Sequence, residues 1–124
     1  MKRLTETQVI QMHNLLIEKT GGSAGIKDSG LLDSALNLPF QSFGGEDIYK
    51  TVRAKSARLA FSIVNNHPFI DGNKRIGILV MLVFLEMNGI EVMCTDEELV
   101  KLGLELASGK ISYEELLNWI IENS

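Results

Sequence analysis

Hydrophobic residues recur along the 124-residue chain at intervals of three and four, the spacing that lines them up on one face of a helix. The pattern is interrupted at glycines and prolines, which commonly end helices. It predicts six helices, over about residues 6 to 19, between Asp28 and Pro39, and over about 48 to 65, 74 to 88, 96 to 107 and 113 to 122. No run of alternating strands is convincing, and only residues 91 to 94 suggest a brief extended segment.

The helix starts and one very apolar helix together define the expected fold. Three predicted helices begin with capping boxes, in which two side chains bond each other's backbone N–H: Thr5 with Gln8, Thr95 with Glu98 and Ser112 with Glu115. The segment from Ile76 to Met87 is apolar almost all round, so it is expected at the centre, covered by other helices. The sequence therefore predicts one compact all-α domain over residues 1–124, with six helices around about residues 74–88.

Composition and charge narrow the class of function. The net charge of −4 argues against a general nucleic-acid-binding surface, which needs a basic patch. Cys94 is the one cysteine, so an internal disulfide is excluded, and we expect a small buried hydrophobe there. The N-terminus lacks the apolar stretch of a signal peptide, and the longest apolar run is roughly half of a membrane span. We therefore expect a cytoplasmic protein that contacts neither nucleic acid nor membrane directly.

The loop from about Pro39 to Glu46 carries two phenylalanines, Phe40 and Phe43, before a pair of glycines. Such a loop could be a packed flap or a docking surface. Because large aromatic side chains are usually buried, the favoured interpretation is that both rings tuck into the core.

The reactive chemistry of the chain is concentrated between His67 and Arg75, in the run His-Pro-Phe-Ile-Asp-Gly-Asn-Lys-Arg. Pro68 disfavours helix at the residue before it, so the third helix should end at His67 and leave the imidazole in a loop. One of the two apolar residues that follow should anchor this loop in the core. After a turn at the Asp-Gly pair, Asn73 is a favourable N-cap for the next helix.

Residue type suggests a role for the polar groups of this run. A histidine, with a pKa of about 6.5, suits a general base, so His67 is expected to take the proton of an attacking hydroxyl. Asp71 offers hard oxygen ligands for Mg²⁺. The free N–H groups of the next helix form an anion site, where Lys74 and Arg75 sit unfavourably unless a polyphosphate is bound. The run therefore predicts phosphoryl or nucleotidyl transfer from a nucleotide.

Taken singly, each of these residues has an ordinary structural explanation, because a lone histidine is more often a core or surface residue than a base. Their joint occurrence in one short run favours a site. His13, by contrast, falls on the polar side of the first helix without such neighbours, and we interpret it as structural or merely exposed.

The run from His67 to Arg75 resembles the signature of the Fic/Doc superfamily, His-x-Phe-x-(Asp or Glu)-(Gly or Ala)-Asn-(Gly or Lys)-Arg, at every signature position. The resemblance extends upstream of this run. There the chain is similar to the Doc (death-on-curing) branch, in Gly25 to Leu36, Pro39, Phe43-Gly44, Tyr49 and Lys55-Ser56-Ala57.

Two positions bear on the chemistry that this resemblance implies. Fic proteins typically transfer AMP from ATP to a target hydroxyl, with glycine where this chain has Lys74 and a second arginine where it has Ile78. Doc-type toxins resemble this chain at Lys74 and are protein kinases that phosphorylate a threonine of elongation factor Tu, which stops translation. Gly72 is the one Fic-like position, since Doc has alanine there, and both small residues permit close backbone approach to phosphate.

The resemblance implies site residues, cofactors and partners. The cofactors are ATP and Mg²⁺, and the implied roles are activation of the target threonine by His67, Mg²⁺ binding by Asp71, and phosphate binding by Gly72, Asn73, Lys74 and Arg75. The inhibitory motif (Ser or Thr)-x-x-x-Glu-(Gly or Asn) of many Fic proteins is absent, so a separate Phd-like antitoxin that inserts a helix near the active site is implied. Two alternatives stay open: a Fic-type AMP transferase, and a non-catalytic binding module that retains the fold.

Overall fold

The computed structural model describes residues 1–124 and contains six α-helices, a short 3-10 helix and a hairpin of two short strands. The helices are α1 (Glu6–Thr20), α2 (Ser29–Asn37), η1 (Leu38–Phe40), α3 (Val52–Asn66), α4 (Asn73–Met87), α5 (Asp96–Ala107) and α6 (Tyr113–Glu122). All three predicted capping boxes are present, at the starts of α1, α5 and α6. The prediction of an all-α fold is therefore confirmed.

The start of α3 differs from the prediction. Hydrophobic spacing placed it at Ile48, but this residue precedes the helix and its side chain is 52% exposed. Thr51 is the N-cap, and its side chain accepts a hydrogen bond from the N–H of Ala54. A specific capping bond therefore decides the boundary, which periodicity alone placed too early.

One short element was not expected from the sequence. A hairpin of β1 (Ser42–Phe43) and β2 (Glu46–Asp47) forms before α3, and strands of two residues are too short for an alternating pattern to reveal. Residues 91–94, for which a brief extended segment was expected, pair with no strand. Instead, the N–H of Met93 donates to the carbonyl oxygen of Asn123, which ties this segment to the end of α6.

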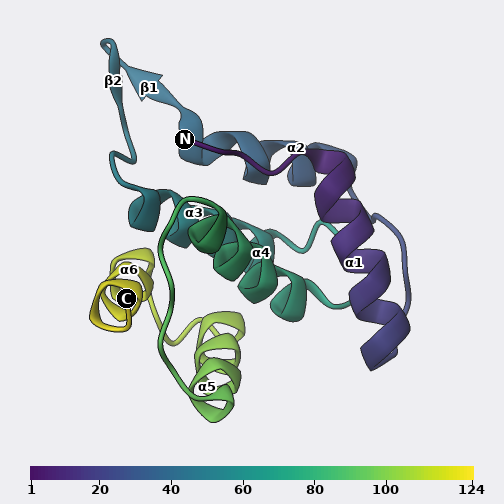
Figure 1. Ribbon diagram of the computed structural model, residues 1–124. Helices are drawn as coiled ribbons and strands as arrows, with labels where there is room; N and C mark the ends of the chain where they lie inside the picture. The colour runs from purple at the N-terminus through teal and green to yellow at the C-terminus, as the bar shows by residue number, and fades with distance from the viewer.

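The helices α3 and α4 form the centre of the fold. Figure 1 shows them side by side, with α1 and α2 on one side and α5 and α6 on the other. Gly77 of α4 allows their close approach, because a Cβ there would overlap the side chain of Val64 in α3. The loop that joins the two central helices carries most of the run from His67 to Arg75, which we call the motif. The two central helices therefore hold this motif loop at both ends.

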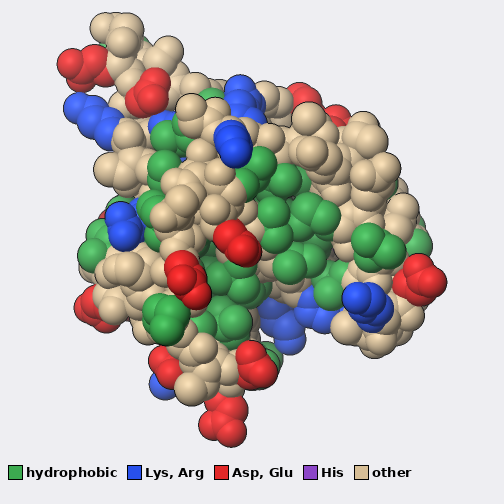
Figure 2. Space-filling view, in the orientation of Figure 1, with side chains coloured by type: hydrophobic (Ala, Val, Ile, Leu, Met, Phe, Trp, Pro, Cys, Tyr) green, Lys and Arg blue, Asp and Glu red, His purple; other side chains and the backbone are tan.

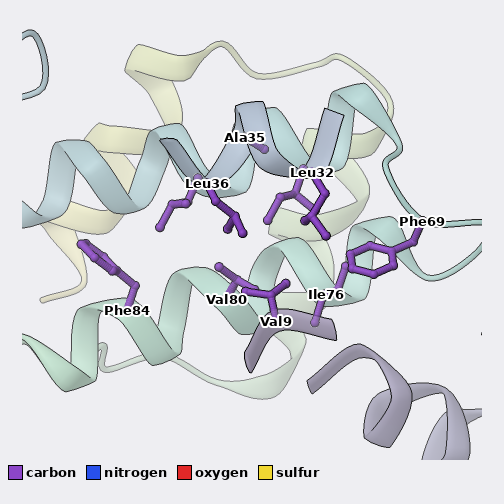
Figure 3. Close-up of a cluster of buried hydrophobic side chains, with 10 residues drawn as sticks. Val9, Leu32, Ala35, Leu36, Phe69, Ile76, Val80 and Phe84 are labelled. Carbon is purple, nitrogen blue, oxygen red and sulfur yellow. The ribbon is translucent and has the colours of Figure 1, made fainter. Parts of the chain in front are cut away.

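Two clusters of buried hydrophobic side chains flank the central pair. Figure 3 shows the first, which contains Val9, Leu32, Ala35, Leu36, Leu59, Ile63, Phe69, Ile76, Val80 and Phe84. The second joins α3 and α4 to the last two helices through Ala57, Ala60, Val64, Met81, Leu85, Leu102, Leu106, Leu116 and Ile120. Because Phe69 belongs to the first cluster, the motif loop is anchored in the core.

The central helix α4 is not covered all round, contrary to the prediction. Ile78, Leu79 and Leu82 are only partly buried and line a groove of about 460 Å³ between α1 and α5. Figure 2 shows hydrophobic side chains gathered on this face, over α4. Despite its apolar sequence, α4 falls short of what a membrane crossing requires, as does every other helix of the chain.

The hairpin and the motif lie at opposite ends of α3. The hairpin precedes the N-terminus of this 15-residue helix, which spans about 22 Å, whereas His67 caps its C-terminus. In Figure 1 the hairpin projects from the body of the molecule. Phe40, just before it, packs against Phe84 as expected, but Phe43 is 84% exposed beside the turn, so the prediction that both rings are buried is wrong for Phe43.

Candidate functional site

His67 ends α3 in a left-handed backbone conformation, with φ 52° and ψ 59°, and it is the one non-glycine residue with positive φ. The proline that follows explains why the helix stops here, as predicted, because it disfavours right-handed helix at the preceding residue. A left-handed conformation is costly for residues other than glycine and is typical of functional positions. The imidazole is exposed and lines a cavity of about 360 Å³.

Phe69 and Asn73 close the motif loop from the inside. Phe69 is 1% exposed and Ile70 57% exposed, so the predicted core anchor is Phe69. The prediction that Asn73 caps α4 is wrong, because Gly72 is the N-cap and Asn73 is the first helical residue. Its buried amide instead bonds both the N–H and the carbonyl oxygen of Phe69. The side chain of Asn73 therefore shapes the loop.

Asp71 holds its carboxylate in a fixed orientation beside His67. One carboxylate oxygen accepts from the N–H of Gly72 at 2.8 Å, and the other accepts from the N–H of Ser23 at 3.1 Å. These two hydrogen bonds, with a smaller contribution from Arg75, hold the pKa of Asp71 below its ordinary value. The side chain is 47% exposed, so an ionised carboxylate remains available to a ligand.

The segment after α1 packs against the motif loop. The N–H groups of Lys27 and Asp28 both donate to the carbonyl oxygen of Pro68, at 2.8 and 3.0 Å. In return, the N–H of Ile70 donates to the carbonyl oxygen of Gly25 at 3.0 Å. The start of the upstream Doc-like segment thus forms a short antiparallel pairing with the loop and restricts its movement.

The start of α4 presents unpaired donors to the cavity. Gly72 is the N-cap with φ 76° and has no side chain with which to bond the first N–H groups of the helix. These groups lie at the positive end of the helix dipole. The residues from Ile70 to Arg75 line the same cavity as His67, together with Val64 and Ala107. The arrangement suits an anion.

The two cations of the motif differ in their surroundings. Arg75 donates to the hydroxyl of Thr20 and, at 3.1 Å, to the carbonyl oxygen of Gly21, and it lies 3.9 Å from the Asp71 carboxylate. The four ion pairs of the chain do not include Lys74. Both side chains line the motif cavity and also one end of the groove between α1 and α5. Lys74 is therefore the cation of the motif that has no ion-pair partner.

The structure contains no group of three or more His, Cys, Asp or Glu side chains that could hold a metal ion without further ligands. Asp71 is the one carboxylate that lines the cavity. This donor set fits a Mg²⁺ that also binds nucleotide phosphates and waters, because Mg²⁺ commonly takes only one or two carboxylates from the protein.

Two parts of this site escaped the sequence analysis. His13 is completely buried, not on a polar face, and its Nε2 lies 2.7 Å from the carbonyl oxygen of Asp71. Val9 and Ile17, one turn before and one turn after His13, are buried on the same face, and this spacing was the signal that would have placed it. The loop from Gly21 to Ser23, where the glycines indicated only the end of the first helix, packs against the Asp71 carboxylate and donates a hydrogen bond to it from Ser23.

Comparison with known proteins identifies the family. The sequence profile of the Fic/DOC family matches residues 3–85, which include the whole motif. The chain belongs to the Fic/DOC family.

Two relatives are similar to the chain over different lengths. Toxin Doc of Mycolicibacterium smegmatis is 38% identical over 72 residues, 58% of this chain and 55% of the relative. Protein kinase doc of Escherichia phage P1 is 29% identical over 112 residues, 90% of this chain and 87% of the relative. The chain thus matches about half the length of the first relative and most of the second.

Proposed function

We propose that this chain is the toxin of a toxin–antitoxin pair and acts in the cytoplasm as a Mg²⁺- and ATP-dependent protein kinase. The proposed target is a translation factor similar to elongation factor Tu, whose phosphorylation would arrest translation. The observation that carries the proposal is the convergence of an exposed His67, an ionised Asp71 and an unpaired Lys74 on one cavity. The names of the two relatives, a toxin and a protein kinase, support the same function.

Each residue then has a task in phosphoryl transfer. His67 accepts the proton of the target hydroxyl as the hydroxyl oxygen bonds to the γ-phosphorus of ATP, and the bond from that phosphorus to the bridging oxygen breaks to release ADP. Asp71 would hold Mg²⁺, which supplies charge neutralisation at the phosphates when bound. The N–H groups at Asn73, Lys74 and Arg75 and the two cationic side chains orient the phosphates.

Phosphate is favoured over AMP as the transferred group by two positions on α4. Lys74 lines the cavity, where a lysine adds a point charge for a terminal phosphate. Ile78, one turn later, lines the apolar groove and not the cavity. A second arginine for AMP transfer is thus missing from the position at which Fic proteins carry it.

The test is a paired labelling experiment in a bacterial translation extract. With ATP labelled at the γ-phosphate, the protein should transfer label to a single protein, and His67→Ala should abolish the transfer. Asn66→Ala is the matched control, because Asn66 is exposed in the last turn of α3 and outside the cavity. Label transferred only from the α-phosphate would support an AMP transferase. Tight binding of a translation factor without transfer of either label would support a non-catalytic module.

An antitoxin is the second proposed partner, and its proposed site is the groove over α4. The groove is lined by apolar side chains of α1, α4 and α5, including Leu16, Leu79 and Leu99, with Lys74 and Arg75 at one end. An amphipathic helix with an acidic residue near its end matches this pattern. An occupant would lie directly beside the two cations that also line the motif cavity, so it would compete with phosphate binding.

Two variants on α5 test whether the antitoxin binds in the groove or elsewhere on the surface. Val100 lines the groove and is 62% exposed, whereas Leu104 is 53% exposed and lies outside it. Val100→Asp should prevent capture of the product of a short reading frame that overlaps the start of this gene, and Leu104→Asp should leave capture unchanged. Equal capture by both variants would rule out the groove as the docking site.

A further inference from the structure

We propose that His13 is a positioning residue that sets the orientation of the Asp71 carboxylate. The inference rests on the proposed function only for its effect on phosphoryl transfer. Its structural part concerns the motif loop alone and can be tested in the absence of any substrate.

The contact between His13 and the motif is direct and buried. The side chain is fully buried, and its Nε2 lies 2.7 Å from the carbonyl oxygen of Asp71, 58 residues away in the chain. Because a carbonyl oxygen can only accept, Nε2 must carry the hydrogen in this bond. The ring also stacks on Phe69, with centroids 3.9 Å apart and planes 11° from parallel. His13 therefore holds the loop by a hydrogen bond at one residue and by packing at another.

The geometry of the peptide bond connects this contact to the carboxylate. The carbonyl oxygen of Asp71 and the N–H of Gly72 belong to one planar peptide unit and point in opposite directions. His13 bonds the carbonyl end of this unit, and the N–H end donates to the Asp71 carboxylate at 2.8 Å. Rotation of the peptide plane would break both bonds together. By holding the carbonyl, His13 keeps the N–H aimed at the carboxylate.

The loop after α1, the helix that carries His13, holds the other oxygen of the carboxylate. Ser23, in the loop that follows α1, donates its N–H to that oxygen at 3.1 Å. Gly72 packs so closely on α1 that an added Cβ would lie 3.1 Å from Ile17 and 3.5 Å from the Nε2 of His13. Thus α1 and the loop after it contact Asp71 and Gly72 from one side and hold them in place.

The second ring nitrogen of His13 makes an imidazole less favourable at this place than a purely apolar side chain. Its Nδ1 is buried and has no hydrogen-bond partner. An unpaired buried polar atom is unfavourable, and an apolar side chain of similar size would avoid that penalty. What the imidazole supplies here, and an apolar side chain could not, is the donor to the carbonyl oxygen of Asp71.

The test compares His13→Leu, which removes the donor and keeps an apolar side chain, with His13→Gln, whose amide can donate at a similar reach. Amide hydrogen exchange is measured by NMR on the free protein. In His13→Leu the Gly72 and Ser23 amides should exchange about tenfold faster, and His13→Gln should restore most of the protection. The amides of Lys27 and Ile70, which pair the other side of the loop, serve as internal controls and should be unchanged.

The labelling assay gives the second readout. His13→Leu should raise the Mg²⁺ concentration needed for half-maximal transfer by about tenfold and leave the KM for the target protein unchanged. Unchanged exchange at Gly72 and Ser23 would overturn the proposal, as would equal acceleration at the control amides, since that would mean general loss of stability. If the expected exchange pattern appears but the unmodified protein transfers no label, the proposed kinase function falls and the role of His13 in the loop stands.

Discussion

The side-chain amide of Asn73 forms a pair of hydrogen bonds with the main chain of Phe69, accepting from its N–H and donating to its carbonyl oxygen, each at 2.9 Å. Both residues are buried, and Phe69 stands in the hydrophobic core. The pair closes the motif loop upon itself and connects the start of α4 to the core anchor. An asparagine at this place therefore holds the shape of the loop that lines the cavity.

Replacement of this asparagine should be costly for stability. Asn73→Ala leaves the N–H and the carbonyl oxygen of Phe69 unpaired in the interior, so the free energy of unfolding should fall by about 2 to 4 kcal/mol. Denaturant unfolding followed by circular dichroism measures the change. The exposed Asn66, changed to alanine, should alter it by less than about 0.5 kcal/mol. A loss for Asn73→Ala as small as that of the control would mean that the pair does not hold the loop.

Two adjacent glycines provide a matched test of the cradle around Asp71. Gly21 and Gly22 both have positive φ, 84° and 110°, so alanine should cost about 1 kcal/mol of backbone strain at either position. Only at Gly22 would the added Cβ overlap the Asp71 carboxylate, whereas nothing lies within 4 Å at Gly21.

Gly22→Ala should therefore weaken Mg²⁺-dependent ATP binding at least about tenfold, an effect that Gly21→Ala should not share. Isothermal titration calorimetry with and without Mg²⁺ separates the two variants. If the two variants bound ATP with equal affinity in the presence of Mg²⁺, the loop after α1 would not be needed to orient the carboxylate.

The lowered pKa of Asp71 predicts a particular dependence of stability on pH. The hydrogen bonds from Ser23 and Gly72 favour the ionised form in the folded protein. The stabilisation is thus present above the ordinary value of 3.8 and is lost as the pH falls through the lower folded-state pKa. The difference in free energy of unfolding between the unmodified protein and Asp71→Asn should shrink over this acidic range. A difference that stays constant down to about pH 2 would contradict the assignment.

The two phenylalanines near the hairpin should respond differently to substitution. Phe40 lies under the guanidinium of Arg3, 3.8 Å from the ring centroid, and contacts Phe84, so Phe40→Ser should cost about 3 kcal/mol of stability. Phe43 is 84% exposed, and Phe43→Ser should change stability by less than about 0.5 kcal/mol.

Phe43→Ser is therefore the variant that tests whether the hairpin docks the target. A raised KM for the target with an unchanged melting temperature would support docking at this distal surface. An unchanged KM would leave the exposed ring without a part in recognition of the target.

The sequence by itself determined the helical fold, because hydrophobic spacing and capping pairs act within a few residues of one another. Thr5 with Gln8 and Ser112 with Glu115 specify their helix starts in this way, and the proline after His67 stops α3 by local sterics. The residues of the site were also visible, since they fall in a single run of the chain. What local patterns could not reveal was the partner of each side chain.

Only the tertiary structure decided how the motif is held. His13 and Ser23 meet Asp71 across 58 and 48 residues of chain, and no spacing rule connects positions so distant. The sequence also could not show that one apolar side of α4 is exposed, because composition does not distinguish a surface that other helices cover from one that they leave open. Long-range packing decides both the contacts of Asp71 and the exposure of α4. It also places His13, which had no apparent role in the sequence, against the loop that carries the carboxylate.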